Sequence, residues 1–467
     1  MSDRTGGPEL SSTGLCRTPV ERAQPPNRPH RTGPATTTAE PLPPNHRSDP
    51  APPAEQESDA HQEPHPRLPR HRTHRPRRRR APRDRLRGRA HRSGRPGRPG
   101  RCASSVPYVS GEGGYDTYRI PAVVRTRAGT LLAFAEGRVG GAGDSGSIDV
   151  VLKRSRDGGC TWGPTAVVAA GGGDTRGNPA PVVDPRTGRI VLLTSYNSGQ
   201  VTEAQIMRGE VTAAQSRRVF VQYSRDDGRR FSPPREVTAA VKPPGWRWYA
   251  TGPGHALALT HGPHRGRLVV PANHSVAPPP GSSDTGQEPR YYGAHALLSD
   301  DGGRHWRLGF VDAAYEGESN ANESSAAQLP DGSVYFSARD QNGPSVGNRL
   351  DTSSRDGGRS VERPYRVQPT LNEVPVVQGS VLQVPGRRGP LLFSGPSVPS
   401  ARRSMALWSS TDRGAHFTRA LTLSQLPAAY SDLVPVGPAT LGLLYETGDQ
   451  GTYERLEFRR IALRELR

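Results

Sequence analysis

The chain has 467 residues, which is enough for two or three ordinary domains or for one large all-β domain with an appendage. Only 32% of its residues are hydrophobic and 6% aromatic, against 54 Gly and 48 Pro, so a substantial stretch is expected to lack a packed core. The formal net charge is +19, and no apolar run approaches the ~18 residues of a membrane-spanning helix, which excludes an integral membrane protein.

The first segment, residues 1–101, is a mixture of Pro, Arg, Ser, Thr and His without periodic order. It holds 22 Arg and 10 acidic residues and therefore carries +12 of the net charge. Such a segment cannot bury enough apolar surface to offset its chain entropy, so we expect a disordered tail. Arg clusters can bind nucleic acid by releasing counterions from phosphate. The alternative is a plain tail or an over-long gene start, which the absence of interleaved aromatic residues favours.

Two further features of the chain concern export and covalent cross-links. The N-terminus has no apolar run of about 7 to 15 residues, which a secretory signal requires. Cys16, Cys102 and Cys160 have no metal-ligand spacing, and at most one pair of them could form a disulfide.

From Val106 onward the sequence consists of short β-type runs separated by Gly, Pro, Asp and Asn, with almost no helical periodicity. This pattern is typical of an all-β sandwich, barrel or propeller. The predicted strands are residues 122–126, 130–136, 149–155, 189–196, 220–226, 267–273, 295–301, 333–339, 390–395, 404–411, 441–446 and 455–461.

A sequence repeat indicates which of these architectures the chain adopts. The frame S-x-D-x-G-x-x-aromatic begins at Ser155, Ser224, Ser299 and Ser410, and a copy without the closing aromatic begins at Ser354. The repeated aspartates are 55 to 75 residues apart, a spacing that suits one four-stranded unit and gives about six units over residues 102–467. Asp and Ser can bond backbone N–H groups of a turn, Gly can take a positive φ, and the aromatic can fill the sheet. We therefore interpret the repeat as structural.

These repeats resemble the Asp boxes of the sialidases, and motifs that occur once lie between them in the order of that family. The chain from about Tyr115 to the C-terminus resembles a bacterial exo-α-sialidase of the retaining type. This resemblance implies a six-bladed β-propeller over residues 102–467, no metal or other cofactor, and a monomer.

Three arginines match those with which the family holds the substrate carboxylate. Arg119 lies in the motif YRIP, Arg339 in SVYFSARDQNG and Arg402 in SARRSMALW. A guanidinium suits this task because its rigid fork forms paired charged hydrogen bonds with a carboxylate and never loses its charge. Arg403 competes with Arg402, which is preferred because an apolar residue, Met405, follows it at the family's spacing.

The resemblance also assigns the residues of catalysis. Tyr430, in AYSDL, matches the family's nucleophile, and Glu323, in NES, matches the base that takes its proton. A phenol is neutral until it attacks, so it avoids the repulsion that a carboxylate nucleophile would meet from the substrate carboxylate. Asp144, in a Gly-rich loop, matches the acid that protonates the leaving oxygen, a role for a carboxyl of raised pKa. Asp149 is its competitor and is assigned to structure.

Other residues match the family's site in less specific motifs. Glu446, in LLYETGD, resembles the glutamate that supports the first arginine, and Arg138, in AEGR, resembles a residue of the pocket wall. Asn178, with Trp248 and Tyr249, resembles rim segments that face the acyl-amino and glycerol parts of the sugar; packing within a loop is the other interpretation of these three. Departures from the family pattern fall on the rim segments and the fourth box.

The resulting hypothesis is hydrolysis of terminal α-linked sialic acids from glycoproteins, glycolipids and oligosaccharides with retention of configuration. A trans-sialidase and a propeller that binds sialylated glycans without cleaving them remain as alternatives. A third hypothesis is that the protein binds nucleic acid through residues 1–101. The family is mostly exported, whereas this N-terminus lacks a signal, so a secreted and an intracellular location both stay open.

Overall fold

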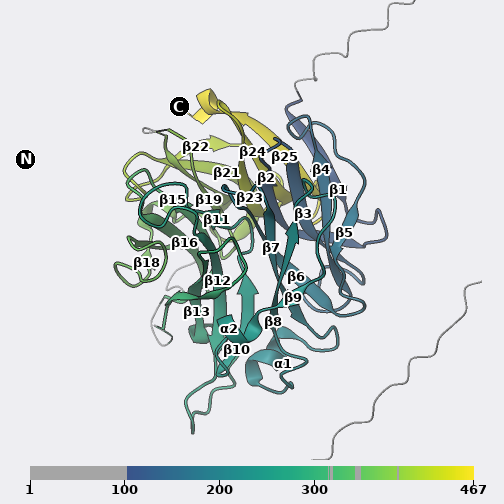
Figure 1. Ribbon diagram of the computed structural model, residues 1–467, viewed down its shortest axis with the longest axis vertical. Coiled ribbons are helices and arrows are strands. Elements are labelled where there is room, and N and C mark those ends of the chain that lie inside the picture. Colours follow the sequence, from purple (N-terminus) through teal and green to yellow (C-terminus); the bar gives the residue numbers. More distant parts are fainter. Residues whose placement is uncertain (1–101, 314, 316–318, 342–348, 387–388, 467) are drawn as a thin grey trace, which may run out of the picture. The chain divides into compact units, whose positions relative to one another are not determined.

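The computed structural model describes residues 102–466 except 314, 316–318, 342–348 and 387–388. The segment 1–101, for which a disordered tail was predicted, lies outside the described residues. The described chain is almost entirely β, with strands gathered into sheets around a common centre (Figure 1). None of the helices in this part has the length and apolarity that a membrane crossing needs.

Five sheets can be followed in chain order within the described residues. The first, of eight strands, comprises β2 (Thr117–Arg125), β3 (Leu131–Arg138), β4 (Ile148–Ser155) and β5 (Ala166–Ala169), then β6 (Thr175–Val183), β7 (Ile190–Asn197), β8 (Arg218–Ser224) and β9 (Arg235–Glu236). The ladder pairing between its two halves consists of the parallel pair Ile148 and Thr175 of β4 and β6. The sheet therefore consists of two four-stranded units in succession.

The other four sheets are antiparallel. The second comprises β10 (Trp246–Thr251), β11 (Leu257–Ala258), β12 (Leu268–Val276), β13 (Tyr292–Ser299) and β14 (Arg307–Val311). The third comprises β15 (Ala321–Gln328), β16 (Val334–Asp340), β17 (Arg349–Ser354) and β18 (Arg366–Val367). The fourth comprises β19 (Ser380–Gln383), β20 (Leu391–Val398), β21 (Ala401–Ser410) and β22 (Thr418–Thr422).

The last sheet joins the two ends of the described chain. It comprises β23 (Ala428–Gly437), β24 (Thr440–Thr447), β25 (Arg455–Ala462) and, paired outside β25, the first strand β1 (Ser104–Val109). A disulfide between Cys102 and Cys160 then ties the start of this region to the turn after β4. The short helices are α1 (Glu203–Arg208), α2 (Thr238–Val241) and the 3₁₀-helices η1 (Pro289–Tyr291), η2 (Pro369–Leu371) and η3 (Leu463–Leu466).

The inner strands follow one another around the centre. β2 contacts β6, β6 contacts β10, β12 contacts β15, β15 contacts β19, β19 contacts β23, and β23 contacts β2 again. Hydrophobic clusters fill the space between successive sheets, as where Trp306 packs with Val191 and Val221. The sequence prediction of an all-β, propeller-like chain is thereby confirmed, as are the twelve predicted strands, each of which lies largely in a strand.

The repeated boxes have the structural role that their sequence predicted. In the third box the Ser299 hydroxyl donates to Asp301 Oδ1 at 2.9 Å and accepts from the Gly303 N–H at 2.8 Å. The Asp301 carboxylate also accepts from two following backbone N–H groups. The corresponding Gly of every box has φ between 75° and 89°, which only Gly adopts without strain. In the other boxes too, the Ser hydroxyl donates to the Asp carboxylate, so each aspartate is bound within its own turn.

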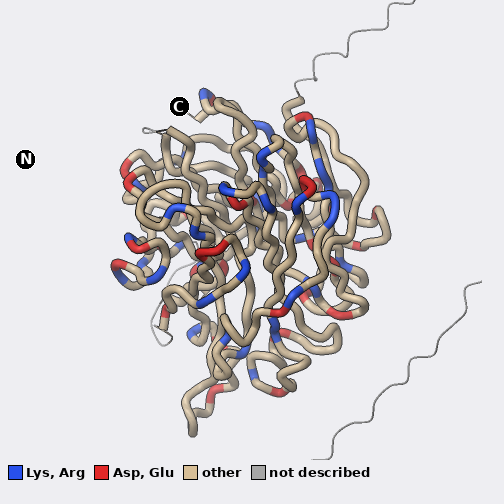
Figure 2. Tube along the Cα trace, viewed as in Figure 1, with Lys and Arg blue, Asp and Glu red and all other residues tan. Residues whose placement is uncertain are grey.

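Basic and acidic positions are interspersed along the described chain (Figure 2). Many of them pair on the surface, as Arg413 does with Asp331 at 2.9 Å. Such exposed pairs contribute little to stability.

Candidate active site

A cavity of about 190 Å³ opens where the inner strands begin, and its wall is mostly polar. It is lined by Arg119, Ile120, Glu136, Arg138, Asp144, Thr175, Asn178, Glu203, Arg217, Trp248, Ala250, Asn273, Tyr292, Asn322, Glu323, Arg339, Gln341, Arg402 and Tyr430. Eight of the ten residues predicted from sequence to form the site are therefore in its wall, and Glu446 contacts two of these eight residues.

Interruptions of strand register aim side chains into this cavity. Register shifts occur in β2 between Arg119 and Ala122, in β6 between Gly177 and Ala180, in β10 between Trp246 and Tyr249, in β15 between Ala321 and Ser324, and in β23 between Ala428 and Ser431. A bulge turns the side chains that follow it away from regular alternation. In each of the five strands the shift includes or adjoins a residue of the cavity wall.

Two of these bulges hold non-glycine residues at positive φ. Ile120 has φ 57° and Asn178 has φ 52°, values that cost free energy unless the surroundings enforce them. The enforcing contacts are visible: the Ile120 N–H donates to Glu446 at 2.9 Å, and the Asn178 N–H donates to Glu136 at 2.7 Å. Buried carboxylates thus fix the backbone on which the pocket is built.

The three predicted arginines meet from different strands. Arg119 lies on β2, Arg339 on β16 and Arg402 on β21, and all three guanidinium groups border the cavity. Arg119 and Arg402 also lie over the ring of Tyr430, at 5.2 Å and 5.7 Å from its centre. Arg403, the competitor of Arg402, is exposed and donates to the Gln425 carbonyl outside the pocket. The structure thus concentrates positive charge on one side of the cavity.

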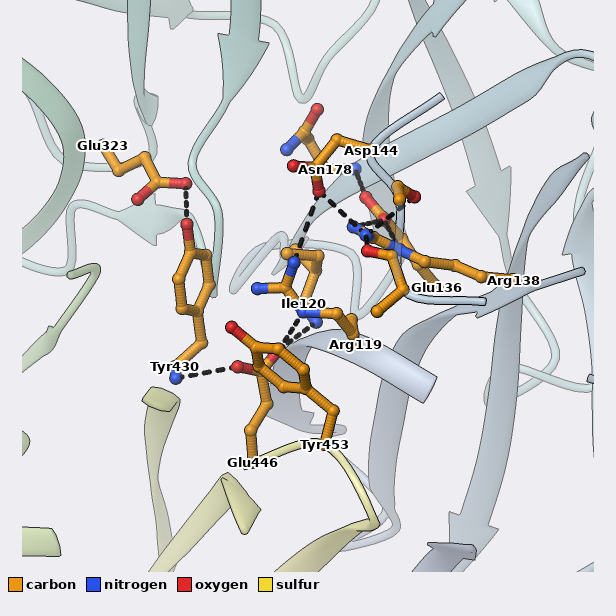
Figure 3. Close-up of polar contacts among 12 residues, drawn as sticks. Arg119, Ile120, Glu136, Arg138, Asp144, Asn178, Glu323, Tyr430, Glu446 and Tyr453 are labelled. Atoms are coloured by element: carbon orange, nitrogen blue, oxygen red, sulfur yellow. Dashed lines mark hydrogen bonds and ion pairs between the residues drawn. The ribbon is translucent and has the colours of Figure 1, made fainter. Parts of the chain in front are cut away.

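Tyr430 and Glu323 form a direct pair (Figure 3). The Tyr430 hydroxyl donates to Glu323 Oε1 at 2.6 Å, while Arg339 Nη1 donates to Glu323 Oε2 at 3.0 Å. Burial and the Glu323 carboxylate raise the pKa of the Tyr430 phenol well above its usual value, although the three arginines act in the opposite direction. The phenol is therefore neutral near neutral pH, and a proton acceptor is already in contact with it.

Asp144 lies across the cavity from this pair. Its Oδ1 accepts from Arg138 Nη1 at 2.8 Å and from Arg119 Nη1 at 3.3 Å. Although the surrounding walls disfavour its ionised form, Arg138 and Arg119 outweigh this effect and hold the pKa of the Asp144 carboxyl below its usual value. This result differs from the raised pKa expected from the sequence, because both flanking arginines stabilise the carboxylate.

Asp149, the competitor of Asp144, has a structural role. It accepts from the Tyr115 hydroxyl at 2.7 Å and from the Gly171 N–H at 2.7 Å, and it does not line the cavity. Arg138 is 2% exposed and also donates to Glu136 Oε2. The other carboxylate oxygen of Glu136 accepts from the Asn178 N–H. A continuous chain of ion pairs and hydrogen bonds therefore runs from Asp144 to Asn178.

Glu446 is fully buried and joins two strands of the site. Its Oε1 accepts from the Arg119 Nε at 3.3 Å and from the Ile120 N–H, and its Oε2 accepts from the Tyr430 N–H at 3.0 Å. One carboxylate of β24 therefore positions both the first arginine and the tyrosine.

Tyr249 is the predicted residue that the structure places elsewhere. It is fully buried in the core, with its ring centre 4.8 Å from that of His295 and 6.1 Å from that of Trp246. The register shift in β10 explains this, because it turns Trp248 into the cavity and Tyr249 toward the neighbouring sheet. The predicted place of Tyr249 at the rim of the site is therefore wrong, and of these two residues only Trp248 lines the cavity.

Several residues of the site escaped the sequence analysis. Arg217 is buried, stacks on Trp248 at 3.6 Å and donates to Asn178 Oδ1 at 3.1 Å. Glu203 of α1 accepts from the Tyr292 hydroxyl, and burial raises the pKa of the Glu203 carboxyl. In an Arg-rich chain nothing marks Arg217 in the sequence. Glu203 and Tyr292 lie in segments without a motif.

Comparison with known proteins gives a consistent result. The BNR repeat-like domain matches residues 129–443. A sialidase of Micromonospora viridifaciens is 31% identical over 73% of this chain, which spans about half of that relative's length. An exo-alpha-sialidase of Aspergillus fumigatus is 31% identical over 72% of this chain and 79% of its own length.

Solved structures share the fold. A Hadza microbial sialidase aligns with a TM-score of 0.65 at 24% identity, over 78% of this chain and 69% of its own. An intramolecular trans-sialidase from Ruminococcus gnavus aligns with a TM-score of 0.64 at 18% identity, over 79% of this chain and 99% of its own. The match to the BNR repeat-like domain and the identity with the Aspergillus relative show that the chain belongs to the sialidase family.

Proposed function

We propose that this protein is a retaining exo-α-sialidase that hydrolyses terminal α-linked sialic acids from glycoconjugates. The observation that carries the proposal is the 2.6 Å hydrogen bond from the Tyr430 hydroxyl to Glu323, inside a cavity bordered by Arg119, Arg339 and Arg402. The proposed architecture is a six-bladed propeller over residues 102–467, with the eight-stranded sheet supplying two of the blades.

The first step uses the cationic side of the cavity. The three arginines hold the substrate carboxylate through charge-assisted hydrogen bonds and fix the anomeric carbon beside Tyr430. The Tyr430 oxygen attacks that carbon while its proton passes to Glu323, and the bond to the leaving oxygen breaks as Asp144 protonates that oxygen. Water, deprotonated by Asp144, then displaces Tyr430, which recovers its proton from Glu323. Two displacements at one carbon retain the configuration.

Asp144 has to gain a proton before it can act as the acid, and binding of substrate supplies the cause. Arg119 contacts Asp144 in the structure. In the proposed complex the same guanidinium turns to the substrate carboxylate. The added negative charge and the loss of one cationic partner both raise the pKa of Asp144. Binding and protonation of Asp144 are therefore coupled.

We expect a carboxylate transition-state analogue to bind with net proton uptake at pH values between the lowered pKa of Asp144 in the free protein and its raised pKa in the complex, and to bind more tightly as the pH falls through this range. Titration calorimetry in two buffers of different ionisation enthalpy measures the uptake. Asp144→Asn should abolish it, and Asp149→Asn, which removes a carboxylate outside the cavity, should retain it. Undiminished uptake in Asp144→Asn would assign the proton to another group.

The direct test of the function is the product released from an α-linked aryl sialoside, followed by proton NMR. A retaining hydrolase yields the α-anomer of the free sugar first. The β-anomer as first product would exclude the double displacement. A 2,7-anhydro sugar would identify an intramolecular trans-sialidase, and binding without any release would identify a glycan-binding propeller.

A further inference from the structure

Tyr453 contacts two of the three arginines without lining the cavity. Its ring lies 4.2 Å from the Arg119 guanidinium carbon, and its hydroxyl accepts from Arg402 Nη1 at 2.8 Å (Figure 3 shows Tyr453 beside Arg119). Arg119 is therefore flanked by the rings of Tyr453 and Tyr430. No motif in the sequence pointed to this residue.

The two arginines differ in how their charge is compensated. Arg119 has ion pairs with Glu446 and Asp144. In the part of the chain that the structure describes, Arg402 has no acidic partner within ion-pair distance and donates instead to the Tyr453 hydroxyl and to the Val376 carbonyl at 3.3 Å. A neutral hydroxyl orients a guanidinium without neutralising it, so the positive charge stays available to an anionic ligand.

The segment that carries Tyr453 is held in place by its own hydrogen bonds. The Glu454 carboxylate accepts from the backbone N–H groups of Asp449, Gln450 and Gly451 at 2.6 to 2.9 Å. The Ser110 hydroxyl donates to the Tyr453 carbonyl at 2.7 Å. The turn between β24 and β25 is thus a preorganised support, and the ring it presents is not a mobile surface side chain.

We propose that Tyr453 is a positioning residue that sets the geometry of Arg119 and Arg402 for the substrate carboxylate. This inference rests on the proposed function, since it concerns recognition of that carboxylate. Its ring fixes Arg119 by a cation–π contact and its hydroxyl fixes Arg402, so one neutral side chain holds two like charges beside each other. Tyr453 would therefore contribute to binding of the carboxylate, an interaction that is present in both the ground state and the transition state.

The experiment compares two competitive inhibitors, a 2,3-didehydro sialic acid and its carboxamide, in which the ligand's negative charge is absent. Tyr453→Phe keeps the ring and removes the hydroxyl. It should weaken binding of the acid about 5- to 20-fold, as expected for loss of a hydrogen bond to a charged group, and of the carboxamide less than about 2-fold. Tyr453→Leu, which also removes the ring, should weaken the acid about 10²-fold. For substrate, Tyr453→Phe should raise KM with kcat nearly unchanged.

Tyr223→Phe is the matched control. The Tyr223 hydroxyl also accepts from an arginine, Arg235 at 3.0 Å, but it lies away from the cavity, so neither inhibitor should change in affinity. If Tyr453→Phe weakens both inhibitors equally, or neither, the positioning role is overturned. If the unaltered protein neither cleaves a sialoside nor prefers the acid to the carboxamide, the proposed function itself fails.

Discussion

Replacing Tyr430 by Phe is expected to leave a folded protein whose kcat on an aryl sialoside is lower by at least about 10³-fold, because the change removes the oxygen that attacks in the proposed mechanism. The fold should survive because the change removes only one hydroxyl, and Glu323 keeps its contact with Arg339. Steady-state kinetics, together with the denaturant midpoint of unfolding, measures both properties.

Tyr335→Phe provides the control for the loss of a buried hydroxyl. Tyr335 is 3% exposed, and its hydroxyl donates to Asp351 at 3.2 Å, so the chemistry removed is the same at a position outside the active-site cavity. Its kcat should equal that of the unaltered protein. Wild-type turnover by Tyr430→Phe would remove the nucleophile from the proposed mechanism.

The strands that the sequence predicted are mostly the second and third of each sheet, where apolar residues alternate or run together. The inner strands were harder to find, because they begin with polar site residues. β15 has the sequence ANESSAAQ and β6 begins TRGNPA, neither of which has the pattern of a buried strand. The polar residues that line the site therefore remove the apolar pattern by which these strands could be predicted.

The residues of the site could be predicted in so far as they sit in motifs that occur once. Tyr430, Glu323 and the three arginines were found in this way, and their convergence depends on contacts 91 to 327 positions apart in the sequence. Alternation could not place Tyr249 and Trp248, because a bulge in β10 breaks the period of two on which any such prediction rests. Tyr453 and Arg217 carry no sequence signal, since their roles arise from what they contact.

Replacing Glu446 by Ala is expected to lower both stability and activity. The change leaves the buried Arg119 without its support and deprives two backbone N–H groups, of Ile120 and Tyr430, of their acceptor. Removing one partner of a buried ion pair typically costs about 3 to 5 kcal/mol of the free energy of unfolding. Because Ile120 is held at positive φ by this contact, the backbone that carries Arg119 should relax as well.

Denaturant unfolding and sialoside kinetics on the same samples separate the two effects. At denaturant concentrations where Glu446→Ala is still folded, its kcat/KM should be at least about 10²-fold lower than that of the unaltered protein. Glu446→Gln keeps the volume and one acceptor oxygen, so its kcat/KM should lie between those of Glu446→Ala and the unaltered protein. Glu236→Ala is the control, because it breaks only a partly exposed pair with Arg218 and should change stability by less than about 1 kcal/mol. An unchanged unfolding midpoint and full activity in Glu446→Ala would mean that the first arginine and the tyrosine are positioned independently, without the carboxylate that now joins them.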